Sequence, residues 1–264
     1  MSWTPVCVEG HFGEWIQGRM GKGGPVALVT VRCPALTVRA PGEGELPFSR
    51  GQLASFAAQL GIAPRFPGTV RTAPLGGGAG ASTATLVALA RAAGVTVSAE
   101  RLAAACLAVE GASDPLMFPR PDALLWASRE GRILREMPAP PACHILGGFW
   151  GAPHRTDPGD ENFDDIADLV DAWDAAVTRG DLPACARLAS ASARRCTARR
   201  SPCLALSDPL PELARELGAL GWLRAHTGSA RGLIFAPGTL PAQGAAALAE
   251  AGLTGVLTFG TGAA

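Results

Sequence analysis

The alternation of apolar and polar positions along the chain predicts a mixture of strands and helices. Residues 6–18 begin as a short strand that leads into a glycine turn. The stretch 26–39 is rich in Val, Leu and Thr, which predicts one or two strands, and Pro34 implies an edge or a bulge there. Further strands are expected at 68–73, 143–150, 221–225, 231–236 and 255–259, with a hairpin formed by 122–128 and 132–137.

Apolar residues at helical spacing predict the helices of the chain. One helix follows a glycine-rich segment and stops at Gly94, and another begins at Ser98, whose hydroxyl can cap its first turn. Gly61 marks the end of a short helix. The expected helices other than the one before Gly94 cover 51–60, 98–109, 164–179, 182–200, 211–220 and 242–251.

The best internal boundary is the segment 151–161, which is rich in Pro, Gly and Asp. A chain of 264 residues suits one large domain or two closely joined ones. We therefore expect an N-terminal domain over 1–150 and a C-terminal domain over 151–264. The element pattern predicts the α+β class, with a pocket between the two halves.

Composition excludes several classes of protein. Hydrophobic residues make up 48% and charged residues 17%, which suits a packed core. Lys+Arg and Asp+Glu are equal at 23 each, so no nucleic-acid partner is expected. The sequence contains no run of eighteen apolar residues, so no membrane span is expected. The first residues lack the pattern of a signal peptide. Seven cysteines without a C-x-x-C pair favour a reducing cytoplasm over a disulfide framework or a zinc site.

The segment 74–85 concentrates glycine directly in front of a helix. Four of the five residues from 76 to 80 are glycine, and Ser82 and Thr83 follow. Such a loop lets backbone N–H groups turn inward without Cβ clashes. The helix N-terminus adds unpaired N–H donors and about half a positive charge. Together these features predict a cradle for the phosphates of a nucleoside triphosphate.

Other interpretations of the glycines fit less well. The Walker A pattern finds its nearest match at 13–20, where both the lysine and the hydroxyl are missing. The dinucleotide pattern occurs at Gly76, Gly78 and Ala81, but the nearest acid downstream, Glu100, falls in the first turn of a helix. A loop and helix cap that bind no ligand are the third alternative.

Two carboxylates close the next predicted helix. Glu110 falls at its C-terminus and Asp114 follows in the turn. A carboxylate at this end of a helix meets the negative end of the dipole, which is unfavourable by some tenths of a kcal/mol unless a cation is supplied. Mg²⁺ bridging Glu110 to bound phosphates would supply that cation. The alternative is a solvated acidic turn.

Two further segments carry polar groups suited to a small ligand. Glu14 and Gln17 lie in an otherwise apolar run, where a carboxylate beside an amide can hold an ammonium or a hydroxyl group. An exposed turn with ordinary surface side chains is the alternative. A second glycine and hydroxyl loop at 226–232 is suited to lining a pocket. His144 and His154 are isolated, and we expect them to be structural or exposed.

Three motifs, in this order, resemble those of the GHMP superfamily of small-molecule kinases, which includes galactokinase, homoserine kinase and mevalonate kinase. Their phosphate loop, P-x3-G-L-G-S-S-A, is matched at 74–84, and their C-terminal glycine motif at 227–233. The L-threonine kinase branch is more similar still. Its opening Cys and Gly-Glu-Leu-x-Gln-Gly are matched by Cys7 and 13–18, and its acidic segment by 110–118. Three departures stand out: Ala81 for Ser, Thr85 for Asp, and Phe12 for the second Cys.

The resemblance implies an ATP-dependent kinase that phosphorylates the hydroxyl of a small amino acid. L-Threonine, for cobalamin nucleotide-loop assembly, is the expected acceptor. Alternatives are a kinase for homoserine or another hydroxylated metabolite, and a non-catalytic nucleotide-binding regulator of the same fold. The implied fold is a GHMP-kinase-like two-part α+β fold, with an N-terminal mixed sheet and helices and a C-terminal ferredoxin-like α/β sandwich. Its expected state is a cytoplasmic monomer or homodimer.

The resemblance also implies roles for individual residues. Ser82 and Glu110 would bind Mg²⁺, and Asp114 would act with Ser82 in catalysis, as a base or to orient the acceptor. The nucleotide would be held by Pro74, Gly76, Gly77, Gly78, Ala79, Gly80, Ala81, Ser82 and Thr83. The acceptor would be contacted by Glu14, Gln17, Gly228 and Ser229. The cofactors would be ATP and Mg²⁺.

Overall fold

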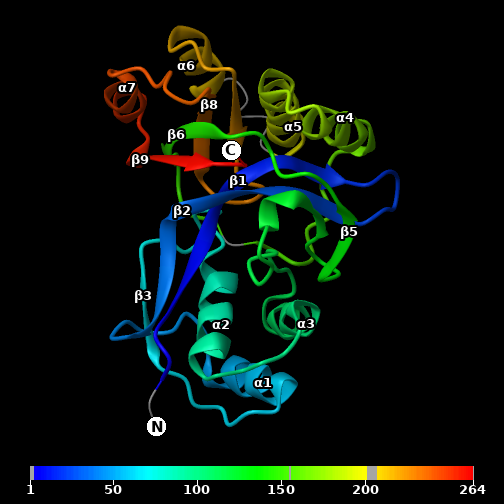
Figure 1. Cartoon of the computed structure of the whole chain (residues 1–264), viewed down its shortest axis with the longest axis vertical. Helices are drawn as coiled ribbons and strands as arrows, with labels where there is room; N and C mark the ends of the chain where they lie inside the picture. Colours follow the sequence, from blue (N-terminus) through cyan, green and yellow to red (C-terminus); the bar gives the residue numbers. More distant parts are fainter. Residues whose placement is uncertain (1–2, 155, 201–206, 264) are drawn as a thin grey trace.

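The computed structural model describes residues 3–154, 156–200 and 207–263, which form an α+β fold (Figure 1). Its strands are β1 (Val6–Arg19), β2 (Val26–Gly42), β3 (Gly68–Arg71), β4 (Leu124–Ala127), β5 (Arg132–Glu136), β6 (Cys143–Phe149), β7 (Gly221–Arg224), β8 (Ala230–Phe235) and β9 (Thr254–Thr261). Its helices are α1 (Arg50–Leu60), α2 (Ala81–Ala92), α3 (Ala99–Glu110), α4 (Ala167–Thr178), α5 (Leu182–Arg200), α6 (Leu210–Glu216) and α7 (Gly244–Glu250), with a 3-10 turn, η1 (Pro121–Ala123).

Within the described residues the strands join in one antiparallel sheet in the order β5-β4-β2-β1-β7-β8-β6-β9, and β3 pairs with β2. The C-terminal strand order, β7-β8-β6-β9, together with α4 and α5 after β6 and α7 before β9, is that of a ferredoxin-like unit. The two parts of the sheet meet at one residue pair, Glu14 with Arg224. Figure 1 shows α1, α2 and α3 gathered at one end of the molecule and α4 to α7 at the other.

Cap residues predicted from the sequence are in place. Ser98 accepts a hydrogen bond from the Arg101 N–H at the start of α3. Gly61 ends α1 with a left-handed φ of 70°. At the start of α1, Ser49 and Gln52 exchange side-chain and backbone hydrogen bonds. These local contacts explain why the predicted helix ends were close to the observed ones.

The first strand corrects one prediction. Residues 6–18 do not contain a strand and then a turn, because β1 runs without a break from Val6 to Arg19. Its pairing with β2 shifts register at three places, and Gly13, with a φ of 67°, lies within one of these bulges. Pro34 lies in another bulge, where Glu9 faces Thr37 and Gly10 faces Cys33. A bulge therefore replaces the predicted glycine turn and accounts for the predicted effect of Pro34.

Three predicted helices are shorter than expected, and one of them, predicted over 242–251, covers only Gly244–Glu250. The helix predicted from 164 begins at Ala167, because Asp165 accepts a hydrogen bond from the Ala167 N–H and Ile166 pairs with the backbone of Arg19. The helix predicted to end at 220 ends at Glu216, because Gly218 turns the chain with a φ of 68°. The Asp165 side chain and the pairing with Arg19 therefore set the start of α4, and a left-handed glycine sets the end of α6.

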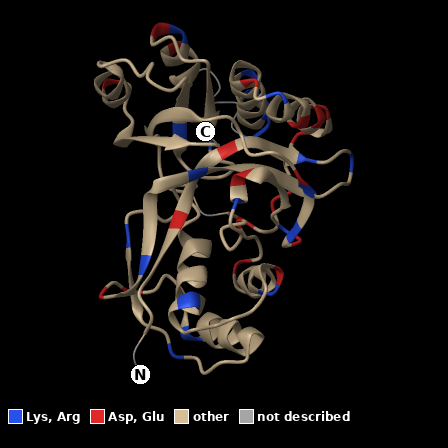
Figure 2. Ribbon diagram, in the orientation of Figure 1, with Lys and Arg blue, Asp and Glu red and all other residues tan. Residues whose placement is uncertain are grey.

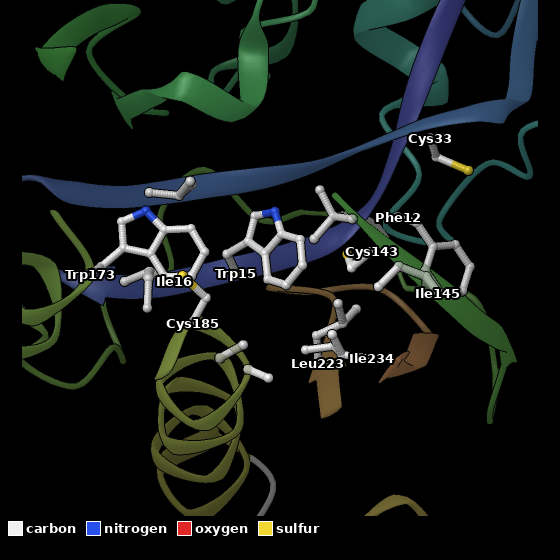
Figure 3. Close-up of a cluster of buried hydrophobic side chains, with 14 of the residues drawn as sticks. Phe12, Trp15, Ile16, Cys33, Cys143, Ile145, Trp173, Cys185, Leu223 and Ile234 are labelled. Atoms are coloured by element: carbon white, nitrogen blue, oxygen red, sulfur yellow. The ribbon is translucent and has the colours of Figure 1, made fainter. Parts of the chain in front are cut away.

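The central core joins both halves of the sequence. Trp15 of β1 and Trp173 of α4 are fully buried, and their ring centroids are 5.5 Å apart (Figure 3). Phe12 lies in the same cluster, where its ring packs edge-on against Phe149 and Phe259 at 5.6 Å. The domain division at 151–161 remains a prediction, but the packing does not separate the two halves.

Charged side chains are distributed over the molecule. In the view of Figure 2, Lys and Arg lie interspersed with Asp and Glu on strands and helices of both halves. Of the helices in the described part of the chain, none combines the length and the apolar character needed to cross a bilayer.

Candidate active site

The candidate site is a cavity of about 240 Å³ lined by residues from both halves of the sequence. β1 and the glycine loop 74–80 contribute to it, together with the first turn of α2. The C-terminal end of α3 and the turn after it also line the cavity, as do residues 154, 156, 226 and 227. The sequence motifs that carried the prediction therefore lie around one space.

The glycine loop is anchored through its carbonyl groups. Four consecutive carbonyl oxygens accept hydrogen bonds from neighbouring segments: Gly76 from His154 (2.9 Å), Gly77 from Ala230 (2.8 Å), Gly78 from Gly13 (3.1 Å) and Ala79 from His11 (3.1 Å). In a trans peptide the N–H points away from the C=O. The N–H groups of residues 78–80 are therefore directed away from these protein partners.

The first turn of α2 continues the row of donors. Its N-cap is Gly80, with a φ of 64°, and no side chain caps the helix. The first turn contains no acidic residue either. The N–H groups and the positive end of the dipole are thus available to an anion at the cavity.

The second glycine loop supports the first. A Cβ on Gly228 would overlap the backbone of Gly77 and Gly78, and a Cβ on Gly78 would overlap Ala225. The two loops can approach this closely only because both positions are glycine. Gly228 therefore packs directly against the glycine loop 74–80.

Glu110 is the acidic residue nearest to the start of α2. Its Oε2 accepts a hydrogen bond of 2.9 Å from Thr83 Oγ1, and that hydroxyl in turn accepts one of 3.3 Å from the Asp114 N–H. Burial raises the pKa of Glu110 to about 8, although the Ser82 and Thr83 hydroxyls oppose the rise. The carboxylate thus lies where a cation would be stabilising.

The donor set fits Mg²⁺. Glu110 is not paired with Lys or Arg among the described residues, and its neighbours Ser82 and Thr83 offer hydroxyl oxygens. Carboxylate and hydroxyl oxygens are hard ligands, and Mg²⁺ commonly combines one or two carboxylates with phosphate oxygens. The described part of the chain contains no group of three or more His, Cys, Asp or Glu side chains placed to hold a metal ion. A magnesium ion here would need phosphate oxygens as well.

Asp114 lies in the turn after α3 and lines the cavity. Its Oδ2 is 3.3 Å from Nε2 of His11, a side chain that is only 3% exposed. Burial lowers the pKa of His11, but the charge and hydrogen bond of Asp114 and the charge of Glu14 outweigh it and raise that pKa to about 9. The ring of His11 is therefore protonated at neutral pH, where it faces the side chain of Asp114.

Glu14 lies at the junction of the two parts of the sheet and also lines the cavity. Its Oε2 accepts a hydrogen bond of 2.5 Å from the His226 N–H, and its Oε1 is 3.9 Å from His11 Nδ1. Burial raises the pKa of Glu14 to about 7, partly offset by the charge of His11. The expected exposed-turn alternative for this segment does not hold, because Glu14 is 2% exposed.

Some of the expected site residues lie outside the cavity lining. Gln17 is buried, and its Nε2 donates to the Arg224 carbonyl oxygen at 2.9 Å. Gly77, Gly228 and Ser229 contact the site only through neighbouring loop atoms, and the Ser229 carbonyl oxygen accepts from the Trp150 N–H. Direct ligand contacts by these four residues remain untested predictions. The remaining expected residues, Pro74, Gly76, Gly78, Ala79, Gly80, Ala81, Ser82, Thr83, Glu14, Glu110 and Asp114, line the cavity.

The departures from the threonine kinase pattern have different locations. Thr85 is fully buried, and its hydroxyl donates to the Ala81 carbonyl oxygen within α2, away from the cavity. Phe12 fills the core described above, and Cys7 is exposed on β1 outside the cavity lining. Of the departures, only Ala81 lines the cavity.

Three histidines line the cavity, His11, His154 and His226, and only the loop that contains His226 was predicted to line a pocket. His11 lies three residues before Glu14, so its place in the opening motif was the available signal. His154, which was expected to be structural or exposed, is exposed at the cavity and donates its N–H to Gly76. Neither residue could be placed without the contacts between distant segments.

Comparison with solved structures gives the architecture. The chain superposes on L. major mevalonate kinase with a TM-score of 0.63 at 14% identity, covering 98% of this chain and 97% of that chain. A putative homoserine kinase from Listeria monocytogenes superposes with a TM-score of 0.58 at 16% identity, covering 97% of this chain and 95% of that chain. The mevalonate diphosphate decarboxylase of Enterococcus faecalis superposes with a TM-score of 0.63 at 13% identity, covering 98% of this chain and 96% of that chain.

These likenesses establish the fold, which is that of GHMP kinases and of an ATP-binding decarboxylase. Neither a family model nor a curated protein sequence matches this chain. The predicted GHMP-kinase-like α+β fold is confirmed. Because the same architecture serves two reactions, function must be argued from the site.

Proposed function

We propose that this protein is an ATP-dependent small-molecule kinase that phosphorylates the hydroxyl of a small amino acid, with L-threonine as the first acceptor to test. One observation carries the proposal. Residues 78–80 of the glycine loop, the uncapped start of α2, Glu110 and Asp114 all line one cavity. Phosphoryl transfer depends on positioning and charge stabilisation, and this arrangement supplies both.

The glycine loop and α2 would hold the phosphate chain by backbone donors. Ser82 and Glu110 would hold Mg²⁺, which when bound supplies positive charge at the phosphates. Asp114 would receive the proton of the acceptor hydroxyl, or orient that hydroxyl. The oxygen of the acceptor would form the bond to the γ-phosphorus as the bond to ADP breaks and ADP leaves. Glu14 is placed to bind an ammonium or hydroxyl group of the acceptor.

The choice of acceptor has less support than the choice of reaction. L-Threonine is favoured by the opening and acidic motifs at 7–18 and 110–118. Homoserine is the second candidate, because a putative homoserine kinase shares the fold over nearly the whole chain. Both acceptors carry the ammonium and hydroxyl groups that Glu14 and Asp114 can bind.

The decisive experiment is coupled ADP release with L-threonine, L-homoserine and L-serine, followed by mass spectrometry of the product. A phosphorylated amino acid formed with one equivalent of ADP supports the proposal. ADP with free phosphate and no phosphorylated acceptor indicates another reaction of this fold. Calorimetry with a non-hydrolysable ATP analogue and Mg²⁺ is run in parallel. Nucleotide binding without turnover of any acceptor would favour the non-catalytic regulator.

A further inference from the structure

His11 occupies a fixed position between the phosphate loop and Asp114. Its backbone N–H donates to the Ala79 carbonyl oxygen at 3.1 Å, which ties the residue to the loop. Its ring Nε2 faces Asp114 Oδ2 at 3.3 Å, and its Nδ1 has no hydrogen-bond partner among the described residues. One residue thus connects the expected phosphate cradle with the expected catalytic carboxylate.

The loop is shaped to admit this ring. A Cβ on Gly80 would lie 2.5 Å from His11 Cδ2 and 2.7 Å from Leu116 Cδ1. Gly80 also has a φ of 64°, which glycine adopts without strain. The glycine that starts α2 therefore makes room for the imidazole as well as exposing the N–H donors of the helix.

The charges around the cavity favour a protonated ring. Three acids line the cavity, Glu14, Glu110 and Asp114, and its described lining contains no Lys or Arg. The charged groups facing His11 are Asp114, from the turn after α3, and Glu14, from its own strand, while Gly80 and Leu116 present apolar surface. A cation at this point reduces repulsion among the carboxylates and between them and an incoming triphosphate.

We propose that His11 is a positioning residue. Its imidazolium donates a charged hydrogen bond to Asp114 and so keeps the carboxylate directed at the acceptor hydroxyl. The same imidazolium adds positive charge beside residues 76–83. This inference rests on the kinase function proposed above. His11 keeps its proton through the reaction, and Asp114 is the group that meets the hydroxyl. The ion pair itself requires no substrate, so it can be tested separately.

The first test is NMR of the imidazole nitrogens in the full-length protein. The chain has 4 histidines, and the spectrum of His11→Gln assigns the His11 signal. We expect wild-type His11 to stay protonated beyond pH 8, and Asp114→Asn to lower its titration midpoint by about one pH unit or more. Titration of wild-type His11 below pH 6.5, or no change in Asp114→Asn, overturns the ion pair. If His11→Gln does not fold, the midpoint that moves in Asp114→Asn identifies the signal.

The second test is steady-state kinetics of His11→Gln, which keeps a donor near Nε2 but loses the charge. We expect kcat to fall by about tenfold or more, while KM for ATP changes by less than about threefold. His144→Gln, on β6 and outside the cavity lining, is the matched control and should keep wild-type kcat. Wild-type kcat in folded His11→Gln overturns the positioning role.

These outcomes separate the two proposals. If no acceptor is phosphorylated but His11 stays protonated in wild type and not in Asp114→Asn, the kinase function fails and the ion pair stands. If an acceptor is phosphorylated at the same rate by His11→Gln, the kinase stands and the role of His11 fails.

Discussion

At the scale of single residues, two acids four positions apart differ in their partners. Glu110 meets the hydroxyls of Ser82 and Thr83, whereas Asp114 meets the ring of His11. Hydroxyl neighbours leave Glu110 able to bind a metal ion, and a cationic neighbour holds the carboxyl group of Asp114 in place. Different environments thus support different roles for two neighbouring carboxylates.

The metal assignment predicts the effect of two substitutions. Ser82→Ala and Glu110→Gln should each lower kcat by about tenfold or more without loss of fold, because each removes an oxygen ligand from the expected Mg²⁺ site. Glu100→Gln, an exposed carboxylate in the first turn of the same helix, is the control. Turnover is measured by ADP release at saturating Mg²⁺, and folding by circular dichroism. Wild-type turnover in either site variant contradicts the assignment.

The His11 pair also predicts how stability depends on pH. The pKa of His11 is about 9 in the folded chain against 6.5 ordinarily, so the folded state binds a proton more tightly. The protonated ring therefore stabilises the folded state fully below pH 6.5, and this contribution is lost as pH rises through 9. The free energy of unfolding should fall by roughly 1–3 kcal/mol over that range. Urea unfolding at several pH values should show a steeper loss between pH 7 and 9 for wild type than for His11→Gln. Parallel curves for the two proteins would contradict the prediction.

The sequence predicted which acids belong to the site but not what they contact. Glu110 and Asp114 follow from helix-end spacing, and the loop 76–83 follows from its glycines, because both signals are local. His11 reaches Asp114 from a strand about a hundred residues earlier in the chain. The amide of Gln17 donates to the Arg224 carbonyl oxygen, a contact that the sequence did not indicate. Such contacts depend on register, which one sequence does not specify.

At the scale of elements, glycine is required at different positions of the chain for different reasons. Gly78 combines a φ of 73° with close contact to Ala225 and Gly228, whereas Gly94 has a φ of 72° in open space. At Gly78, a side chain would overlap its neighbours and would also strain the left-handed backbone. At Gly94, a side chain would only strain the left-handed backbone.

These two glycines make a matched pair of substitutions. Gly94→Ala should lower the free energy of unfolding by about 1–2 kcal/mol through backbone strain alone. Gly78→Ala should cost about 1–3 kcal/mol more from overlap, and should also weaken binding of an ATP analogue. Chemical unfolding and calorimetry measure the two effects. Equal losses of stability, or unchanged nucleotide affinity in Gly78→Ala, would argue against the close packing of the two loops.

Most elements could be predicted, since capping residues and apolar spacing act locally. Ser98 and Gly61 set the ends of their helices as expected. β1 was mistaken for a strand and a turn because Gly13 has the conformation of a turn, yet neighbouring strands hold it in a bulge. Tertiary pairing thus overrode a correct local signal.

At the scale of the molecule, one core crosses the predicted boundary at 151–161. Trp15 from the first half packs on Trp173 from the second, and Phe12 packs between Phe149 and Phe259. A second cluster, around α1, α2 and α3, is formed by the first half alone, whereas the central core takes side chains from both halves. The two-part fold is therefore expected to behave as one cooperative unit.

This packing predicts a single unfolding transition. Far-ultraviolet circular dichroism and tryptophan fluorescence should give the same urea midpoint, because Trp15 and Trp173 report on a core shared by both halves. Trp173→Ala should lower that midpoint for both probes, with a cost of about 3–5 kcal/mol. Phe66→Ala, a partly buried ring near α1, is the milder control. Two separate transitions would show that residues 1–150 and 151–264 unfold independently.

The carbonyl anchoring of the loop also limits how the protein can diversify. Each peptide between 76 and 80 is tied to another part of the backbone, so a single substitution cannot redirect one donor without disturbing a neighbouring segment. His154, Thr156 and Thr227 have no such constraint on their side chains, and the two threonine hydroxyls bond only to each other at 2.8 Å among the described residues. Under the proposed function, substitutions that change the acceptor preference should therefore accumulate at His154, Thr156 and Thr227, while the glycine loop stays unchanged between descendants.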